Sequence, residues 1–280
     1  MNASVTKQHV VSRVVLAQFA VDRHLEVEDS RRPGRWRLRS PAAVGYVSDF
    51  VEHDSGQVEA LWQTVETRLP QAISVALQGV APEPGSPEES TLRDCIALHW
   101  ARSKAVKTAA HQSWLRVQAR HRDEFRSRGD HVLAGLFERR TGRTATPAEL
   151  DALNAELHTG PEEVLDGRHF AARVPEFYGF ARSHLARSHV QVLLCGDGVE
   201  DLVMSDAPVL TPSGRRKGLN PSQGVALGDA TAAGMPLGPR LFVSMHDVAE
   251  VRELTAAGAT LLNSLQEQVR VVQMFRRPAP

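Results

Sequence analysis

Two glutamates, Glu59 and Glu66, have a spacing from which an acidic site can be built. They lie seven positions apart in a stretch whose apolar residues recur at helical spacing, so a continuous helix places both carboxylates on one face, two turns apart. A solvated face is the simplest interpretation, whereas a buried pair needs cationic or metal partners. His99 and Arg102, on the next predicted helix, have suitable types. If the two helices pack antiparallel, we expect a bidentate ion pair between Glu66 and Arg102, an arrangement that is structural more often than catalytic.

A second group of polar residues follows a predicted strand, at residues 204–209. Pro208 favours an extended entry into the next segment, which leaves Ser205 and Asp206 at the exit of the strand. Such exits often hold functional side chains, although a turn in which Ser or Asp caps the backbone is the simpler interpretation. A nucleophilic Ser205 needs an adjacent base, and no residue nearby in the sequence supplies one.

Several common catalytic and metal-binding motifs are missing from the sequence. The 12 histidines form no HExxH or comparable ligand spacing, and no P-loop, GxGxxG or GxSxG occurs. The two cysteines, Cys95 and Cys195, are far apart and outside any CxxC pattern, so the sequence gives no support for a disulfide framework or a thiolate zinc site. The sequence therefore predicts no metal site, specifies no cofactor and favours a reducing compartment.

The composition is that of an ordinary folded protein, with 280 residues, 42% of them hydrophobic and 24% charged. The 33 basic and 33 acidic side chains cancel, so net charge does not support nucleic-acid binding. Basic clusters at 31–35, 215–217 and 276–277 lie in or beside stretches with Gly or Pro and are interpreted as solvated loops. A local basic patch is the alternative interpretation of these clusters. No apolar run approaches the roughly 18 residues that cross a bilayer, so no membrane partner is expected and the cytoplasm is the predicted location.

The elements that must position these residues are outlined by hydrophobic periodicity and turn signals. Residues 25–28 and 35–39 are predicted as the strands of a hairpin, and residues 10–20 as either a buried strand or a short helix. A helix is expected at 55–78, which Pro70 kinks or divides. The other predicted elements are a strand near 42–50, an exposed connection near 81–90, helices at 91–127, 130–140, 147–157 and 162–186, paired strands at 190–195 and 202–204, a flexible loop near 212–234, a strand at 241–245, and helices at 248–257 and 261–275.

This order of elements predicts a single α+β domain over residues 1–280. A helix-dominated middle lies between strand-rich N-terminal and C-terminal segments, which we expect to form a small antiparallel or mixed sheet.

Four motifs, taken in order, resemble a bacterial family catalogued as a domain of unknown function, number 4238. They are residues 9–19, the pairs Val58-Glu59 and Val65-Glu66, residues 98–103, and the stretches 204–209 and 235–239. Asn263 also fits, whereas this chain has Ser12, His99 and Ala207 where the family tends to have Pro, Gln and Asn. The resemblance implies that one recurring framework contains His9, Glu59, Glu66, Arg102, Ser205 and Asp206. It implies no particular activity.

The framework supports two hypotheses from different classes. In the first, the chain is an intracellular, non-catalytic binding or regulatory protein with a buried polar network, and Glu59, His99 and Arg102 are candidate binding residues for a small molecule or a protein. In the second, it is a hydrolase-like effector of the nuclease or nucleotide hydrolase type. The residues of the second hypothesis are His9, Glu66 and Asp206 as acid-base or metal-binding groups, Arg102 as anion holder and Ser205 as a further candidate. Neutral net charge and the missing ligand motif favour the first hypothesis.

Overall fold

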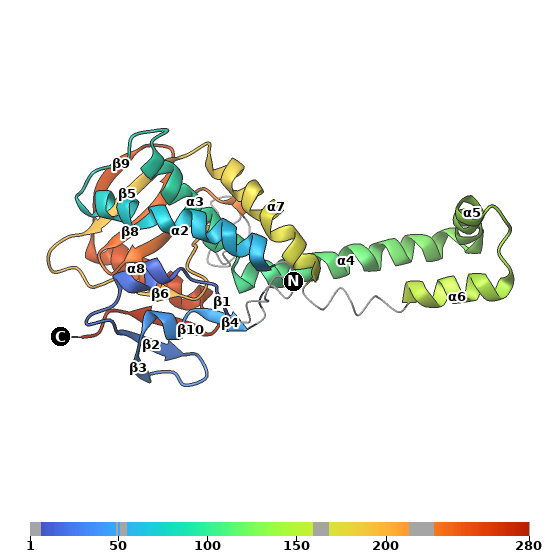
Figure 1. Cartoon of the computed structure of the whole chain (residues 1–280), viewed down its shortest axis with the longest axis horizontal. Coiled ribbons are helices and arrows are strands. Elements are labelled where there is room, and N and C mark those ends of the chain that lie inside the picture. The colour runs from blue at the N-terminus through green and yellow to red at the C-terminus, as the bar shows by residue number, and fades with distance from the viewer. Residues whose placement is uncertain (1–6, 49, 51–54, 159–167, 213–226, 280) are drawn as a thin grey trace.

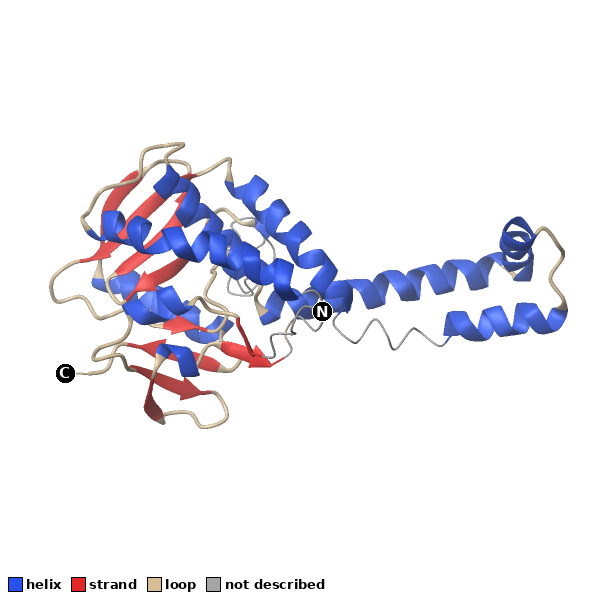
Figure 2. Ribbon diagram, in the orientation of Figure 1, coloured by secondary structure: helices blue, strands red, loops and turns tan. Residues whose placement is uncertain are grey.

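The computed structural model describes residues 7–48, 50, 55–158, 168–212 and 227–279. These residues form a body that holds the strands, and a helical arm that extends away from it (Figures 1 and 2). The predicted α+β class, with strands near both ends of the chain and helices in the middle, is confirmed. Within the described ranges, no helix combines the length and the apolar character needed to cross a membrane.

The first sheet joins the two ends of the chain. Its four strands are antiparallel, and the C-terminal strand lies between the N-terminal hairpin and a short strand from the middle of the sequence. In spatial order they are β3 (Trp36–Arg39), β2 (Leu25–Asp29), β10 (Gln273–Arg276) and β6 (Met204–Ser205). A separate antiparallel pair is formed by β1 (Lys7–His9) and β4 (Tyr46–Ser48).

The second sheet is mixed, because its edge strand β9 runs parallel to β5 while the other neighbours are antiparallel. Its order is β7 (Ala233–Gly238), β8 (Leu241–His246), β5 (His189–Cys195) and β9 (Glu250–Leu254). The side chains of β5 and β8 alternate between two apolar cores, so both faces of this sheet are covered.

Helices cover the two faces of the second sheet. The larger core contains apolar side chains of α2 (Ser55–Leu77), α3 (Pro87–Ala101), α7 (Arg168–Leu185) and α1 (Arg13–Gln18). On the other face Phe242 and Leu254 pack against α8 (Ala256–Val269), which also contacts β6 and so lies between the two sheets (Figure 1). Short 3-10 helices in the described part of the body lie at Pro41–Ala43 and Leu227–Asp229.

The arm consists of α4 (Lys104–Arg128), α5 (Asp130–Thr141) and α6 (Pro147–His158). The long helical stretch predicted at 91–127 is divided at Arg102 and Ser103, where α3 ends and α4 begins in a new direction. Ser103 causes this division in part, because its Oγ accepts a hydrogen bond from the N–H of Val106 at 3.1 Å and caps the start of α4. At about 1.5 Å per residue, α4 alone extends over roughly 37 Å.

Several local predictions are confirmed. The N-terminal hairpin is present, and the open assignment of residues 10–20 resolves into the short helix α1. Helix α2 continues through Pro70 without being divided. Helices α5, α6 and α7 match their predicted ranges, although residues 159–167 lie outside the described structure. Residues 213–226 of the predicted loop also lie outside it, and α3 begins at Pro87, within the connection predicted near 81–90.

Three predictions near the C-terminus are wrong. Residues 250–254 form strand β9 rather than a helix, because parallel pairing with β5 buries Leu254 opposite Cys195. The helix predicted at 261–275 is instead α8, which ends at Val269 before strand β10. Strands β5 and β6 do not pair with each other, since β6 belongs to the first sheet, beside β10. Short apolar runs allow either assignment, and the partner that decides between them is remote in sequence.

Close packing of β7 against β8 makes Gly234 a sensitive position. An added Cβ would lie 2.6 Å from Cε1 of Phe242 and 2.7 Å from the carbonyl oxygen of Val243. We predict that Gly234→Ala lowers the free energy of unfolding by about 1–3 kcal/mol, measured by urea denaturation. The control is Gly179→Ala on the exposed face of α7, where no atom lies within 4 Å and Ala stabilises a helix by up to about 1 kcal/mol. Equal stabilities of the two variants would contradict the packing.

Candidate functional site

Arg102 lies at the junction between α3 and α4 and is 1% exposed. Its guanidinium carbon is 4.3 Å from the ring centroid of Trp62, and Nη1 is 3.6 Å from Oε1 of Glu66. Burial lowers the pKa of Arg102 to about 10, and the carboxylates of Glu66 and Glu59 oppose that shift. The predicted ion pair between α2 and α3 is therefore present. Its distance is longer than the 2.7–2.9 Å or so of bidentate pairs, so bidentate geometry is not observed.

The two glutamates of α2 face this guanidinium rather than open solvent. The Glu66 side chain is 26% exposed, and Glu59 is half-buried. Burial raises the pKa of Glu59, Arg102 opposes this, and the nearby Glu66 carboxylate raises it further. The acidic stripe thus compensates the charge of Arg102, which is why a guanidinium can be held at full burial.

His9 approaches the same cluster from strand β1. Burial lowers its pKa to about 4, with the charges of Arg102 and then Arg13 acting in the same direction. Its ring packs edge-on against Tyr46, with centroids 6.0 Å apart. The imidazole is therefore neutral at pH 7 and lies within the electrostatic influence of Arg102.

Among the described residues, three buried nitrogen atoms of this cluster find no hydrogen-bond partner: Nε and Nη1 of Arg102 and Nε2 of His9. Buried polar atoms in proteins are nearly always hydrogen-bonded, so each exception requires an explanation. We call the group His9, Glu59, Trp62, Glu66 and Arg102 the Arg102 cluster.

His99 lies beside the Arg102 cluster but joins two backbone segments instead of pairing with a glutamate. Its Nδ1 donates to the carbonyl oxygen of Cys95 at 2.8 Å, and its Nε2 accepts from the N–H of Ser12 at 3.0 Å. A peptide N–H can only donate, which fixes the neutral tautomer. Burial lowers the pKa of His99 to about 3, assisted by Arg102. His99 therefore ties the start of α1 to α3, and its predicted role as a partner for the acidic face is wrong.

Ser205 and Asp206 form a second group, between α8, β6 and the segment that precedes β10. The N–H and the Oγ of Ser205 both donate to Oε1 of Gln266, each at 2.9 Å. Oδ1 of Asp206 accepts from the N–H of Val271 at 2.9 Å, and Oδ2 accepts from Val272 at 3.0 Å. Burial raises the pKa of Asp206, and these backbone donors oppose the shift.

The structure thus brings together four of the six framework residues predicted to converge, which are His9, Glu59, Glu66 and Arg102. Ser205 and Asp206 occupy the second group. The two groups are neighbours through Lys104, two positions after Arg102, because the charge of Lys104 opposes the raised pKa of Asp206. Among the described residues, no set of three or more His, Cys, Asp or Glu side chains is arranged to hold a metal ion.

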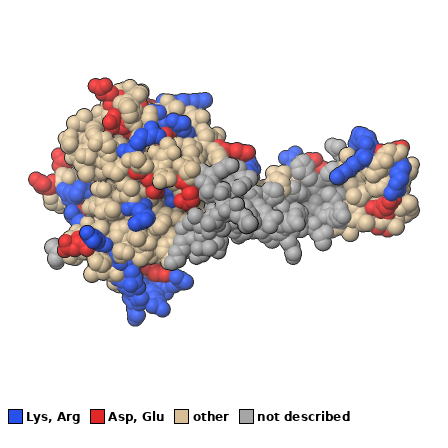
Figure 3. All heavy atoms as spheres, viewed as in Figure 1, with Lys and Arg blue, Asp and Glu red and all other residues tan. Residues whose placement is uncertain are grey.

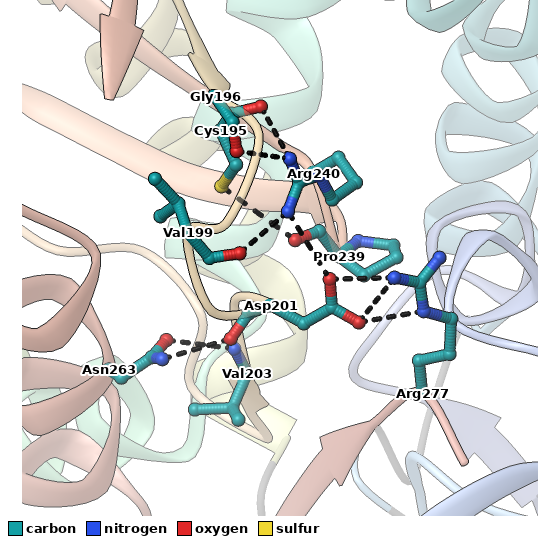
Figure 4. Close-up of polar contacts among 9 residues, drawn as sticks. All are labelled: Cys195, Gly196, Val199, Asp201, Val203, Pro239, Arg240, Asn263 and Arg277. Atoms are coloured by element: carbon teal, nitrogen blue, oxygen red, sulfur yellow. Dashed lines mark hydrogen bonds and ion pairs between the residues drawn. The ribbon is translucent and has the colours of Figure 1, made fainter. Parts of the chain in front are cut away.

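A third polar group, centred on Asp201, was not predicted from the sequence (Figure 4). Nε and Nη2 of Arg277 donate to the two carboxylate oxygens of Asp201, both at 2.7 Å. Arg240 lies 3.8 Å from the same carboxylate and donates to the carbonyl oxygens of Val199 and Cys195 at 2.7 and 2.8 Å. These contacts fix the segment that passes from the second sheet to the first.

Asn263 of α8 holds the same segment by its backbone. Its Oδ1 accepts from the N–H of Val203 at 2.9 Å, and its Nδ2 donates to the carbonyl oxygen of Asp201 at 3.0 Å. The basic pair at 276–277 is therefore not a solvated loop, because Arg276 pairs with Glu26 at 2.6 Å and Arg277 pairs with Asp201. No local signal in the sequence indicates these contacts, which join residues up to 250 positions apart.

The ion pair at the Arg102 cluster can be tested by a double-mutant cycle. Glu66→Met alone leaves the buried guanidinium with less compensation and is expected to lower the free energy of unfolding by about 2–3 kcal/mol. Adding Arg102→Met removes that charge and keeps an apolar contact with Trp62, so the double variant is expected to lie close to the native protein. Urea denaturation measures both. Additive losses in the double variant would show that the two side chains are not coupled.

Acidification is expected to destabilise the fold through His99. The ordinary pKa of 6.5 applies to the unfolded chain and a pKa of about 3 to the folded one, so between these values only the unfolded state binds the proton. The free energy of unfolding therefore falls as the pH falls below about 6.5. We predict that His99→Gln reduces the slope of stability against pH in urea denaturation, while His131→Gln, at an exposed position on α5, leaves it unchanged. An unaltered slope in His99→Gln would contradict this assignment.

Comparison with known proteins gives a family without an assigned activity. The family model described as "Protein of unknown function (DUF4238)" matches residues 7–257. That range includes the Arg102 cluster, Ser205, Asp206, Asp201 and Arg240, whereas Asn263, Gln266 and Arg277 lie beyond it. No curated protein and no solved structure matches the chain. The match covers well over half of the sequence, and the chain belongs to the DUF4238 family.

Proposed function

We propose that this protein is a non-catalytic binding or regulatory protein, whose buried polar groups hold the fold together. The main support for the proposal is the hydrogen bonding of Asp206, which the hydrolase hypothesis places in one site with His9 and Glu66. Both of its carboxylate oxygens accept backbone N–H groups from Val271 and Val272. A carboxylate held in this way has little capacity to bind a metal ion or to move a proton.

The other reactive side chains are similarly engaged. Ser205 is fully buried and its hydroxyl donates to the amide oxygen of Gln266, which is not a base. Both ring nitrogens of His99 are hydrogen-bonded. Burial raises the pKa of the Cys95 thiol, which disfavours the nucleophilic thiolate.

His9 is poorly suited to general base catalysis. A base works best with a pKa near the working pH, whereas the pKa of His9 is about 4. The charge of Arg102 also opposes the positive imidazolium that forms when a base takes up a proton. These properties favour a structural role for the Arg102 cluster, in which it holds β1, α2 and α3 together.

The hydrolase-like alternative, of the nuclease or nucleotide hydrolase type, has one observation in its favour. The unpartnered nitrogens of Arg102 are donors that an anion would satisfy. The carboxylates of Glu59 and Glu66 act against it, because they already neutralise the guanidinium and would repel a phosphate. The binding hypothesis is therefore preferred.

An activity assay separates the two hypotheses. Purified protein is incubated with nucleoside triphosphates and with single- and double-stranded DNA and RNA, in Mg²⁺ or Mn²⁺. We expect no turnover that depends on the Arg102 cluster. The proposal fails if turnover is observed, is lost in Glu66→Gln and in His9→Ala, and persists in Arg139→Gln, which changes an exposed residue of the arm. Unfolding curves of each variant confirm that the folded protein is being assayed.

A further inference from the structure

The sequence between residues 31 and 39 contains five arginines and no acidic residue. In the structure these residues form the turn and the second strand of the β2–β3 hairpin. Strand β3 is the edge of the first sheet, with β2 as its single neighbour there. Basic atoms gather at the lower edge of the body in Figure 3, where Figure 1 places this hairpin. Neutral net charge over the whole chain therefore coexists with a local concentration of positive charge.

The arginines of β3 lack counter-charges. Arg35, Arg37 and Arg39 are exposed, and the described structure shows no side-chain ion pair or hydrogen bond for any of them. Arg31 differs, because it pairs with Asp29 at 2.6 Å, although its side chain remains 80% exposed. Three guanidinium groups are thus free for an external anion.

The acidic residues of the neighbouring strand are already engaged. Glu26 pairs with Arg276 at 2.6 Å, and Glu28 pairs with Arg270 and accepts the N–H of Gly34. In the register of the hairpin, Arg37 and Arg39 lie opposite the apolar Val27 and Leu25, so β2 places no carboxylate beside them on their face. An acidic partner of the exposed arginines must therefore come from outside the described structure.

The hairpin is held in shape before any partner binds. The N–H of Arg32 donates to the carbonyl oxygen of Asp29 at 2.8 Å, and the N–H of Arg31 donates to its carboxylate at 2.9 Å. Arg276 stacks on Trp36, with its guanidinium carbon 3.9 Å from the ring centroid. A preorganised turn and strand lose little backbone entropy on binding, which favours association.

We propose that the β2–β3 hairpin binds the phosphate backbone of a nucleic acid. Arg37 and Arg39 lie two residues apart on β3, so they project from the same face about 6.8 Å apart along the strand, and Arg35 precedes them. Such a row suits a linear polyanion, and guanidinium groups pair with phosphate in bidentate geometry. The inference rests on the proposed non-catalytic binding function and names its partner.

The same residues argue for contacts with the backbone rather than with bases or lipid. Trp36 is half-buried under Arg276 and does not offer a free ring for base stacking. Leu38, at 57% exposed, is the single large apolar side chain that β3 presents to solvent, which is too little for insertion into a membrane surface. Binding is therefore expected to be independent of sequence and strongly dependent on salt.

Fluorescence anisotropy with a labelled oligouridylate, an oligothymidylate and a random-sequence DNA duplex tests the proposal. The variant is Arg35→Gln, Arg37→Gln and Arg39→Gln combined, and the control is Arg139→Gln, Arg140→Gln and Arg187→Gln, three exposed arginines elsewhere with the same change of charge. We expect at least tenfold weaker binding by the hairpin variant at low salt, and binding by the control within about twofold of the native protein. The plot of log association constant against log salt concentration has a negative slope. On single strands its magnitude should decrease by about 2, roughly 0.7 for each phosphate that an arginine no longer neutralises.

Four other outcomes would overturn the inference about the hairpin. Equal weakening in both variants would show a general charge effect, and unchanged binding by the hairpin variant would place the site elsewhere. Preference for vesicles with phosphatidylserine over every nucleic acid would assign the surface to lipid. Aggregation of the hairpin variant with unchanged binding would mean that the arginines only protect the sheet edge. Cleavage of the probes that is lost in Glu66→Gln would instead contradict the proposed non-catalytic function. That outcome would leave the contribution of the hairpin to affinity unchanged.

Discussion

Burial of the Arg102 guanidinium is the constraint around which the middle of this protein is organised. A charged group at 1% exposure is stable only if opposite charge is brought to it, and α2 must therefore pack with Glu59 and Glu66 toward the end of α3. Arg102 is also the last residue before Ser103 starts α4, so the direction of the arm is set at the same point. His99, one turn earlier, attaches α1 to this junction through the N–H of Ser12. Arg102 and the neighbouring His99 thus link the N-terminal segment, two body helices and the arm.

The two sheets are joined by a different set of interactions. The chain leaves β5 at Cys195 and enters β6 at Met204, and the intervening segment is held by its carbonyl and N–H groups to Arg240 and Asn263. Beyond β6, Asp206 caps two N–H groups that precede β10. A segment between sheets cannot satisfy its backbone by strand pairing, and charged or amide side chains do so instead. The contacts of Ser205 and Asp206 therefore hold together the segments that join β6, α8 and β10.

Sequence reasoning succeeded where the determining interactions are local. The hairpin around Pro33, helix α2 and helices α5 to α7 follow from turn residues and periodicity within a few turns of chain. It also predicted the pairing of Glu66 with Arg102, because helical spacing places each on a definable face. It failed for 250–254, whose strand conformation depends on parallel pairing with β5, and for Arg277, whose partner Asp201 is 76 positions away. It also failed to separate Asp206 from His9, because the backbone N–H group that binds Asp206 belongs to Val271, which is remote in sequence.

The distribution of charge follows from these joints. Within the described structure, carboxylates that stabilise the body are paired with arginines from other segments, as Glu28 is with Arg270 and Asp94 with Arg182. A carboxylate that is engaged in such a pair no longer neutralises other arginines or lysines on the surface. A chain with equal numbers of acidic and basic residues can therefore carry an uncompensated positive surface wherever arginines are exposed and their acidic neighbours are engaged in packing. Net charge predicts the partner of a protein only when its charges are evenly distributed. In this fold β3 is the exception, because Arg37 and Arg39 lie opposite apolar residues of β2 while Glu26 and Glu28, on the other face, pair with arginines of the C-terminal segment.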